Sequence, residues 1–99
     1  MFVLELTYTA PIERVEAALQ EHVEWLKKEF AAGTFIVAGR KVPRDGGVIL
    51  ATGSDRATVE QLVAEDPFSV AGVCTYRITE FAATTTAPPL EAYRETPQP

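Results

Sequence analysis

Apolar and polar residues alternate from Phe2 to Tyr8, with the apolar side chains on every second position. A period of two is typical of a β-strand that buries one face. Three later stretches, rich in Phe, Ile and Val or alternating in the same way, predict further strands at residues 34–42, 47–52 and 73–81. The pattern therefore indicates four strands spread along the whole chain.

A helical spacing replaces this alternation in two places. From Ile12 to Phe30 apolar residues recur every three or four positions, and Gly33 follows as a stop signal. A second helix is expected to end at Val63, and Ser54 or Asp55 supplies the side-chain oxygen that caps its first turn. Both helices thus have an apolar stripe to lay against a sheet.

Asp66 stands at the junction between the second helix and the last strand. Pro67, which follows it, lacks a backbone N–H and has a φ suited to the first position of a helix. Asp66 is therefore the expected cap of a short extra turn, which Gly72 can end. A carboxylate has about four acceptor sites, so this structural role leaves room for another partner.

The elements follow the order β-α-β-β-α-β, which predicts an α+β, ferredoxin-like fold with an antiparallel four-stranded sheet and both helices on one face. Asp45 and Gly46 form the expected hairpin turn between the second and third strands, with Gly46 at a positive φ. The other sheet face mixes residues such as Val3 and Thr79. Such a face is typically closed by a second copy, so we expect a two-fold homodimer.

Residues 1–82 are expected to make one domain, because 99 residues have room for one sheet and two helices. Residues 83–99 form a tail of threonine, proline and polar residues without helix or strand periodicity. Such a segment is either flexible or lies as an arm across a partner subunit, and the sequence does not decide between these alternatives.

A formal net charge of −5 argues against binding nucleic acid or an anionic membrane, since both need clustered positive charge. The single cysteine, Cys74, falls on an apolar face and is expected to be a buried, inert thiol. No basic segment followed by a long apolar run begins the chain, so we expect a cytoplasmic protein. One histidine and one cysteine without ligand spacing predict no metal site, and we expect no cofactor.

His22 is the only histidine, and it falls at the rim of the apolar stripe of the first helix. A lone histidine at such a place is most often a packed, hydrogen-bonded side chain. It becomes a proton-transfer group when an acceptor orients one ring nitrogen and leaves the other free. Asp66 is the candidate acceptor, because both helices share one face of the sheet. The residues alone leave both alternatives open.

Three further residues are candidates for contact with a small ligand. Arg40 belongs, with Lys41 and Arg44, to the only basic cluster, which is either a solvated sheet edge or a site for a carboxylate or phenolate. Phe68 either belongs to the core or lines a ligand pocket. Ser69 is more readily explained as a turn hydroxyl than as a nucleophile.

Three runs of the chain, at residues 22–27, 35–39 and 62–73, resemble the YCII-related (YciI-like) family, and the similarity extends over about residues 2–81. The Asp-Pro-Phe segment followed by Ala-Gly-Val is its most specific part. The resemblance implies a dimeric α+β barrel of ferredoxin-like subunits, related in fold to muconolactone isomerases, with a dyad of His22 and Asp66 in a cleft. The family includes a dehydrochlorinase that acts on a chlorinated hydroxyhydroquinone.

These observations favour a small cofactor-independent enzyme, an isomerase or lyase, in which His22 transfers a proton and Asp66 orients it. Its substrate would be small, cyclic or aromatic, and anionic. The alternative is a non-catalytic module that binds a small molecule or another protein, and a dimer without a ligand is a third reading. Gly39, Arg40 and Lys41 stand where the family often has Gly-Pro, which bears on the ligand that the cleft accepts.

Overall fold

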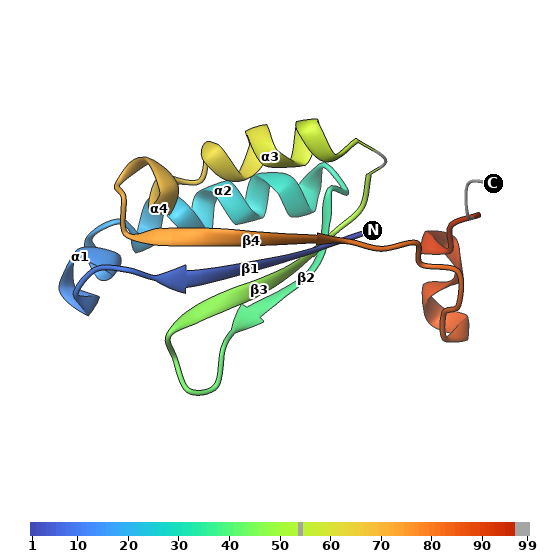
Figure 1. Cartoon of the computed structure of the whole chain (residues 1–99), viewed down its shortest axis with the longest axis horizontal. Coiled ribbons are helices and arrows are strands. Elements are labelled where there is room, and N and C mark those ends of the chain that lie inside the picture. The colour runs from blue at the N-terminus through green and yellow to red at the C-terminus, as the bar shows by residue number, and fades with distance from the viewer. Residues whose placement is uncertain (54, 97–99) are drawn as a thin grey trace.

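The computed structural model describes residues 1–53 and 55–96 of the chain. Its strands and helices follow one another along the sequence (Figure 1) in the order β1 (Phe2–Tyr8), α1 (Ile12–Ala17), α2 (Leu19–Ala31), β2 (Phe35–Arg40), β3 (Gly46–Ala51), α3 (Arg56–Ala64), α4 (Pro67–Val70), β4 (Cys74–Glu80) and the 3₁₀-helix η1 (Pro88–Tyr93).

The strands form one four-stranded sheet in the order β2-β3-β1-β4, and every neighbouring pair is antiparallel. In the centre of the sheet Leu4 lies opposite Ile49 on one side and Ile78 on the other. The helices α2 and α3 lie over the same face of this sheet (Figure 1). The structure therefore confirms the predicted α+β, ferredoxin-like fold.

The alternation in β1 determines what the sheet buries. Phe2, Leu4 and Leu6 are at most 3% exposed, and they face the helices, while the residues between them are only half-buried. Two clusters of buried side chains result, one built on Phe2 and Leu4 and the other on Leu6 and Phe68. Tyr76 of β4 packs against both clusters, so it lies where they meet.

The apolar spacing predicted one continuous first helix, but the structure divides it into α1 and α2. Ala18 interrupts it with φ −101° and ψ 0°, and its N–H bonds the carbonyl of Val15 at 3.1 Å, three residues back. Val15 and Ala18 are both buried in the cluster that contains Phe68. The break thus follows tertiary packing, and it makes His22 part of the first turn of α2, with its N–H bonded to the carbonyl of Ala18.

The predicted hairpin turn at Asp45 and Gly46 was also wrong in its geometry. Gly46 is the first residue of β3, and the positive-φ glycines among the described residues are Gly33, Gly53 and Gly72. A Cβ at Gly46 would clash with the carbonyl oxygen of Leu6. Glycine is needed here because β1 approaches closely, while the connection itself runs through residues 41–45.

The segment after β4 leaves the sheet as a separate projection (Figure 1). It contains η1, which the sequence pattern did not predict. The carboxylate of Glu95 bonds the terminal amino group of Met1 at 2.7 Å and the N–H of Ala83 at 2.8 Å. The bond from Ala83 and the nearby amino group lower the pKa of Glu95. Within the described residues no helix is long and apolar enough to cross a membrane.

Candidate functional site

Asp66 is the N-cap of α4, as the sequence predicted. Its Oδ1 accepts the N–H of Phe68 at 2.9 Å, and Pro67 occupies the first helical position. Gly72, with φ 69°, lies just beyond the end of this short helix. The side chain of Asp66 is 0% exposed, so its polar atoms depend on partners within the protein.

His22 of α2 supplies the second partner of Asp66. The Nδ1 of His22 lies 2.7 Å from Oδ1 of Asp66, although the two residues are 44 positions apart in the chain. The imidazole is 7% exposed and stacks on the ring of Phe68, with 3.9 Å between ring centroids and 7° between planes. Helix α4 therefore holds this histidine twice, through a hydrogen bond and through a stacked aromatic ring.

Tyr76 of β4 completes the surroundings of the carboxylate. Its hydroxyl donates to Oδ2 of Asp66 at 2.5 Å, on the side opposite the bonds to Oδ1. Burial raises the pKa of Tyr76 far above its ordinary value, and the charge of Asp66 raises it further. Asp66 thus has hydrogen-bond partners in α2, α4 and β4.

A pocket of about 250 Å³, which we call the histidine pocket, lies between α2 and the hairpin of β2 and β3. His22 and Phe68 belong to its wall, and most of the remaining lining is apolar or glycine: Leu6, Tyr8, Leu19, Val23, Leu26, Phe30, Ala38, Gly39, Arg40, Gly46, Gly47, Val48 and Ile49. Such a lining with few polar groups is typical of small-molecule sites.

The second ring nitrogen of His22, Nε2, is not held by Asp66. It makes no hydrogen bond to the described residues. Among those residues, the only side-chain nitrogen or oxygen that is both fully buried and unpartnered is Nε1 of Trp25. Nε2 of His22 is therefore reachable from the open space, while Nδ1 is held by Asp66.

The structure separates the predicted basic cluster. Arg40 ends β2 and lines the histidine pocket as an exposed side chain. Lys41 instead bonds the hydroxyl of Thr7 at 3.0 Å on the other face of the sheet. Arg44 lies 3.7 Å from the carboxylate of Glu16. Of the three cations, only Arg40 is thus placed to meet a ligand beside His22.

The two remaining candidates from helix α4 have different surroundings. Phe68 is 1% exposed and belongs to both the core and the wall of the histidine pocket, and its contact with a ligand stays a prediction. The hydroxyl of Ser69 donates to the carbonyl of Val63 at 2.7 Å, and Ser69 does not belong to the lining of this pocket. The structure thus gives Ser69 the role of a turn hydroxyl.

Cys74 lies half-buried behind Asp66 on β4. Burial raises the pKa of its thiol to about 11, and the charge of Asp66 acts in the same direction. The thiol is therefore protonated at neutral pH and a poor nucleophile. Across residues 1–53 and 55–96, no three histidine, cysteine or carboxylate side chains lie together as a metal site would require.

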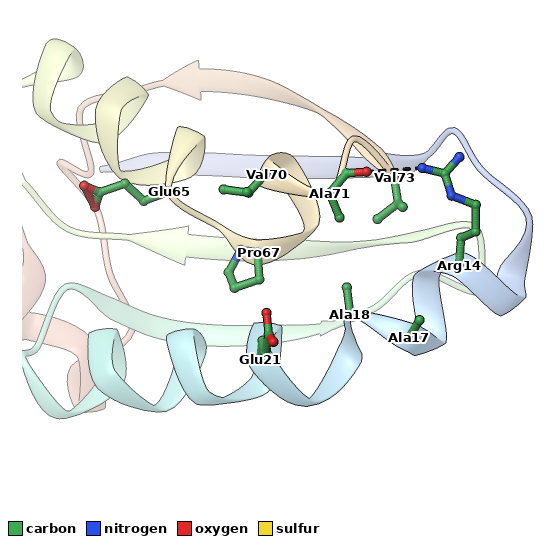
Figure 2. A pocket seen from close by; sticks show the side chains of 9 residues that line it. All are labelled: Arg14, Ala17, Ala18, Glu21, Glu65, Pro67, Val70, Ala71 and Val73. Atoms are coloured by element: carbon green, nitrogen blue, oxygen red, sulfur yellow. Dashed lines mark hydrogen bonds between the residues drawn. The ribbon is translucent and has the colours of Figure 1, made fainter.

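A larger hollow, which we call the outer groove, lies between α1, α2 and α4 (Figure 2). Its volume is about 530 Å³, and Arg14, Glu21 and Glu65 are its charged residues. The guanidinium of Arg14 donates to the carbonyl of Ala71 at 3.2 Å. Neither His22 nor Arg40 lines this groove, so the larger of the two hollows is not the one that contains the histidine.

Sequence reasoning missed the bond from Tyr76 to Asp66. Tyr76 falls within the stretch 73–81, whose alternation predicts a strand and no contact with Asp66. The relevant signal is the register, which sets Tyr76 opposite Leu6 in the centre of the sheet. The distance to Asp66 then depends on how α4 packs on β4, which no local pattern reports.

Comparison with known proteins agrees with this architecture. A family model, the YCII-related domain, matches residues 1–82. No curated protein matches the sequence. A solved structure of 5-chloro-2-hydroxyhydroquinone dehydrochlorinase from Burkholderia phenoliruptrix, in complex with 2,5-dihydroxybenzoquinone, is similar with a TM-score of 0.66 at 18% identity, over 82% of this chain and 93% of that chain. At this identity the similarity concerns the fold, whereas the family match spans most of the sequence, and the chain therefore belongs to the YCII-related domain family.

Proposed function

We propose that this protein is a cofactor-independent enzyme that moves a proton on a small cyclic or aromatic substrate. The observation that carries the proposal is the 2.7 Å contact between His22 and a fully buried Asp66, at the wall of an apolar pocket. A histidine oriented through one nitrogen, with the other facing a pocket, is the arrangement that general acid-base catalysis requires.

In this proposal Nε2 of His22 takes a proton from an acidic O–H or C–H of the substrate. The resulting imidazolium is stabilised by the carboxylate of Asp66. In a lyase reaction, a leaving group such as chloride departs with the bonding electron pair and a new double bond forms. In an isomerase reaction, the proton returns to another carbon. Proton transfer of this kind contributes about 10²- to 10⁴-fold, which suits substrates that are already acidic.

The size and the apolar lining of the histidine pocket favour a substrate with one planar ring. An apolar cavity of about 150 Å³ accepts benzene, and the histidine pocket, at about 250 Å³, leaves space for ring substituents. Arg40 at the rim offers a forked donor for a carboxylate or phenolate group. The structurally similar dehydrochlorinase acts on a chlorinated hydroxyhydroquinone, so substituted hydroquinones are the first compounds to test.

A homodimer belongs to the same proposal. Val3 and Val37 both lie opposite Leu50 in the sheet register, on the face away from the helices, and Val37 is 53% exposed. Apolar residues on an open sheet face are suited to packing against the same face of a second copy. Sedimentation at micromolar concentration should show the mass of two chains, and a single-chain mass would contradict the dimer.

The enzyme proposal is tested with 5-chloro-2-hydroxyhydroquinone, following chloride release and the absorbance of the ring. Lactones and enols are assayed beside it as isomerase substrates. His22→Gln should lower kcat by about 10²-fold or more, because the base is removed while the pocket stays apolar. Arg14→Gln in the outer groove is the control and should keep wild-type turnover. Ligands that raise the melting temperature without any turnover would favour the alternative, a non-catalytic binding module.

A further inference from the structure

We propose that Tyr76 is a positioning residue that keeps Asp66 ionised and thereby places the proton of neutral His22 on Nδ1, leaving Nε2 bare toward the histidine pocket. This inference deepens the proposed function and rests on it for its catalytic meaning. Its structural content, the placement of one proton, concerns the resting protein and can be measured without a substrate.

When the imidazole is neutral, the contact between His22 and Asp66 is compatible with two arrangements. An ionised Asp66 accepts the proton of Nδ1, and Nε2 then offers a lone pair to the pocket. A protonated Asp66, with which the pair holds one proton more, donates to a bare Nδ1 instead, and Nε2 then carries the proton of the neutral imidazole. A distance of 2.7 Å between Nδ1 and Oδ1 fits both. Only the first arrangement provides a base, so the choice between them decides what the pocket can do.

The other two partners of Asp66 favour the first arrangement. The backbone N–H of Phe68 donates to Oδ1. This backbone nitrogen cannot act as an acceptor, so it could not accept a proton from a protonated Asp66. The hydroxyl of Tyr76 lies 2.5 Å from Oδ2, within the short range typical of a hydroxyl that donates to a charged oxygen. Each hydrogen bond donated to a carboxylate favours its ionised form. A proton on Oδ1, as the second arrangement requires, would share that oxygen with the N–H that Phe68 donates to it.

The hydroxyl of Tyr76 also keeps its proton, and so remains a hydrogen-bond donor, over a wide range of pH. Its burial raises the pKa of the phenol far above the ordinary value, and the neighbouring charge of Asp66 adds to this, so the phenolate does not form near neutral pH. Asp66 is the only side-chain partner of the Tyr76 hydroxyl among the described residues. Tyr76 does not line the histidine pocket, so any effect on a bound substrate passes through Asp66 and His22.

The test is nuclear magnetic resonance of protein with isotope-labelled histidine, because the shifts of the ring nitrogens distinguish a protonated from a bare nitrogen. The wild type should show a proton on Nδ1. In Tyr76→Phe at the same pH, Asp66 should take up a proton from solvent more readily, and the ratio of the two forms of the neutral imidazole should move roughly 10- to 100-fold toward Nε2–H, the worth of a hydrogen bond to a charged group. A wild-type ratio in Tyr76→Phe, or Nε2–H as the main form of the wild type, would overturn the inference.

Tyr8→Phe is the matched control. Tyr8 lines the histidine pocket and contacts Phe68 edge-on, with 6.0 Å between centroids, and among the described residues its hydroxyl makes no hydrogen bond to Asp66. It should leave the tautomer ratio unchanged. A shift as large as that of Tyr76→Phe would show that the loss of any nearby tyrosine hydroxyl has this effect, which contradicts a specific role of Tyr76.

A second measurement uses the unmodified protein and so does not depend on the folding of a variant. The ring-carbon shift of labelled Tyr76 should remain that of a neutral phenol at about pH 10.5, where an ordinary tyrosine is mostly ionised. Ionisation of Tyr76 near the ordinary pKa of a tyrosine would refute the claim that its hydroxyl remains a donor. If the tautomer result holds and no substrate is turned over, the proposed function fails while the proton placement stands.

Discussion

The histidine pocket and the outer groove are two hollows that share helix α4, and they differ in what their polar atoms contact. The outer groove is about twice as large, at about 530 Å³ against 250 Å³. Its charged residues are exposed. The histidine pocket instead has a buried pair, His22 and Asp66, fixed by bonds from three elements. An oriented and desolvated polar group, more than volume, marks a place where chemistry can occur.

Two consecutive residues, Glu65 and Asp66, differ in the same way as the two hollows. Glu65 is exposed and belongs to the outer groove, while Asp66 is fully buried behind the histidine pocket. Glu65 follows the last residue of α3, and Asp66 caps the first turn of α4. Water can solvate Glu65, whereas Asp66 depends on Phe68, His22 and Tyr76 for its hydrogen bonds.

The largest expected effect comes from removing each of these carboxylates in turn. Asp66→Ala should lower the free energy of unfolding by about 3–5 kcal/mol, because it leaves the buried donors of Phe68, His22 and Tyr76 without an acceptor. Glu65→Ala should change it by less than about 0.5 kcal/mol. Urea denaturation followed by circular dichroism measures both. Similar losses in the two variants would remove the distinction between the hollows.

A smaller effect is expected from the glycines that border the histidine pocket. Gly46→Ala should lower the free energy of unfolding by about 1–3 kcal/mol, because its Cβ would press on the carbonyl of Leu6 and separate β1 from β3. Gly39→Ala is the matched control, since a Cβ there meets no atom within 4 Å. Thermal unfolding of both variants tests this, and equal melting temperatures would show that the strands can part without loss.

The features predicted correctly from the sequence depend on neighbours in the chain. The cap at Asp66 follows from Pro67, and the buried face of β1 follows from its own alternation. The break at Ala18 and the role of Gly46 were not predicted, because each depends on a contact with a distant element. Local patterns do not contain that information.

The candidate site was predictable to a similar extent. The fold placed α2 and α4 on one face of the sheet, and the family resemblance selected His22 and Asp66 as a pair. Tyr76 was missed because its bond to Asp66 depends on how α4 packs on β4. Arg40 and Lys41 were grouped as neighbours in sequence, yet strand alternation sends them to opposite faces of the sheet.

The smallest expected effect is a loss of stability in alkali that originates behind the histidine pocket. In the unfolded chain Cys74 releases its proton near pH 9.0, whereas burial raises the pKa of the folded thiol to about 11. Between these values the folded state binds more protons than the unfolded state, so stability is complete below about pH 9 and falls as the pH rises toward 11. The loss is limited because Cys74 is only half-buried.

Cys74→Ala isolates this contribution. Urea midpoints measured at intervals between about pH 8 and 10 should fall less steeply in the variant than in the wild type, since the variant has no thiol to titrate. Glu21→Gln in the outer groove should keep the wild-type slope, because its side chain is exposed and is not among the groups that shift the pKa of Cys74. Parallel slopes for the wild type and Cys74→Ala would mean that alkali acts elsewhere, and the histidine pocket would then differ from the outer groove only through Asp66 and its partners.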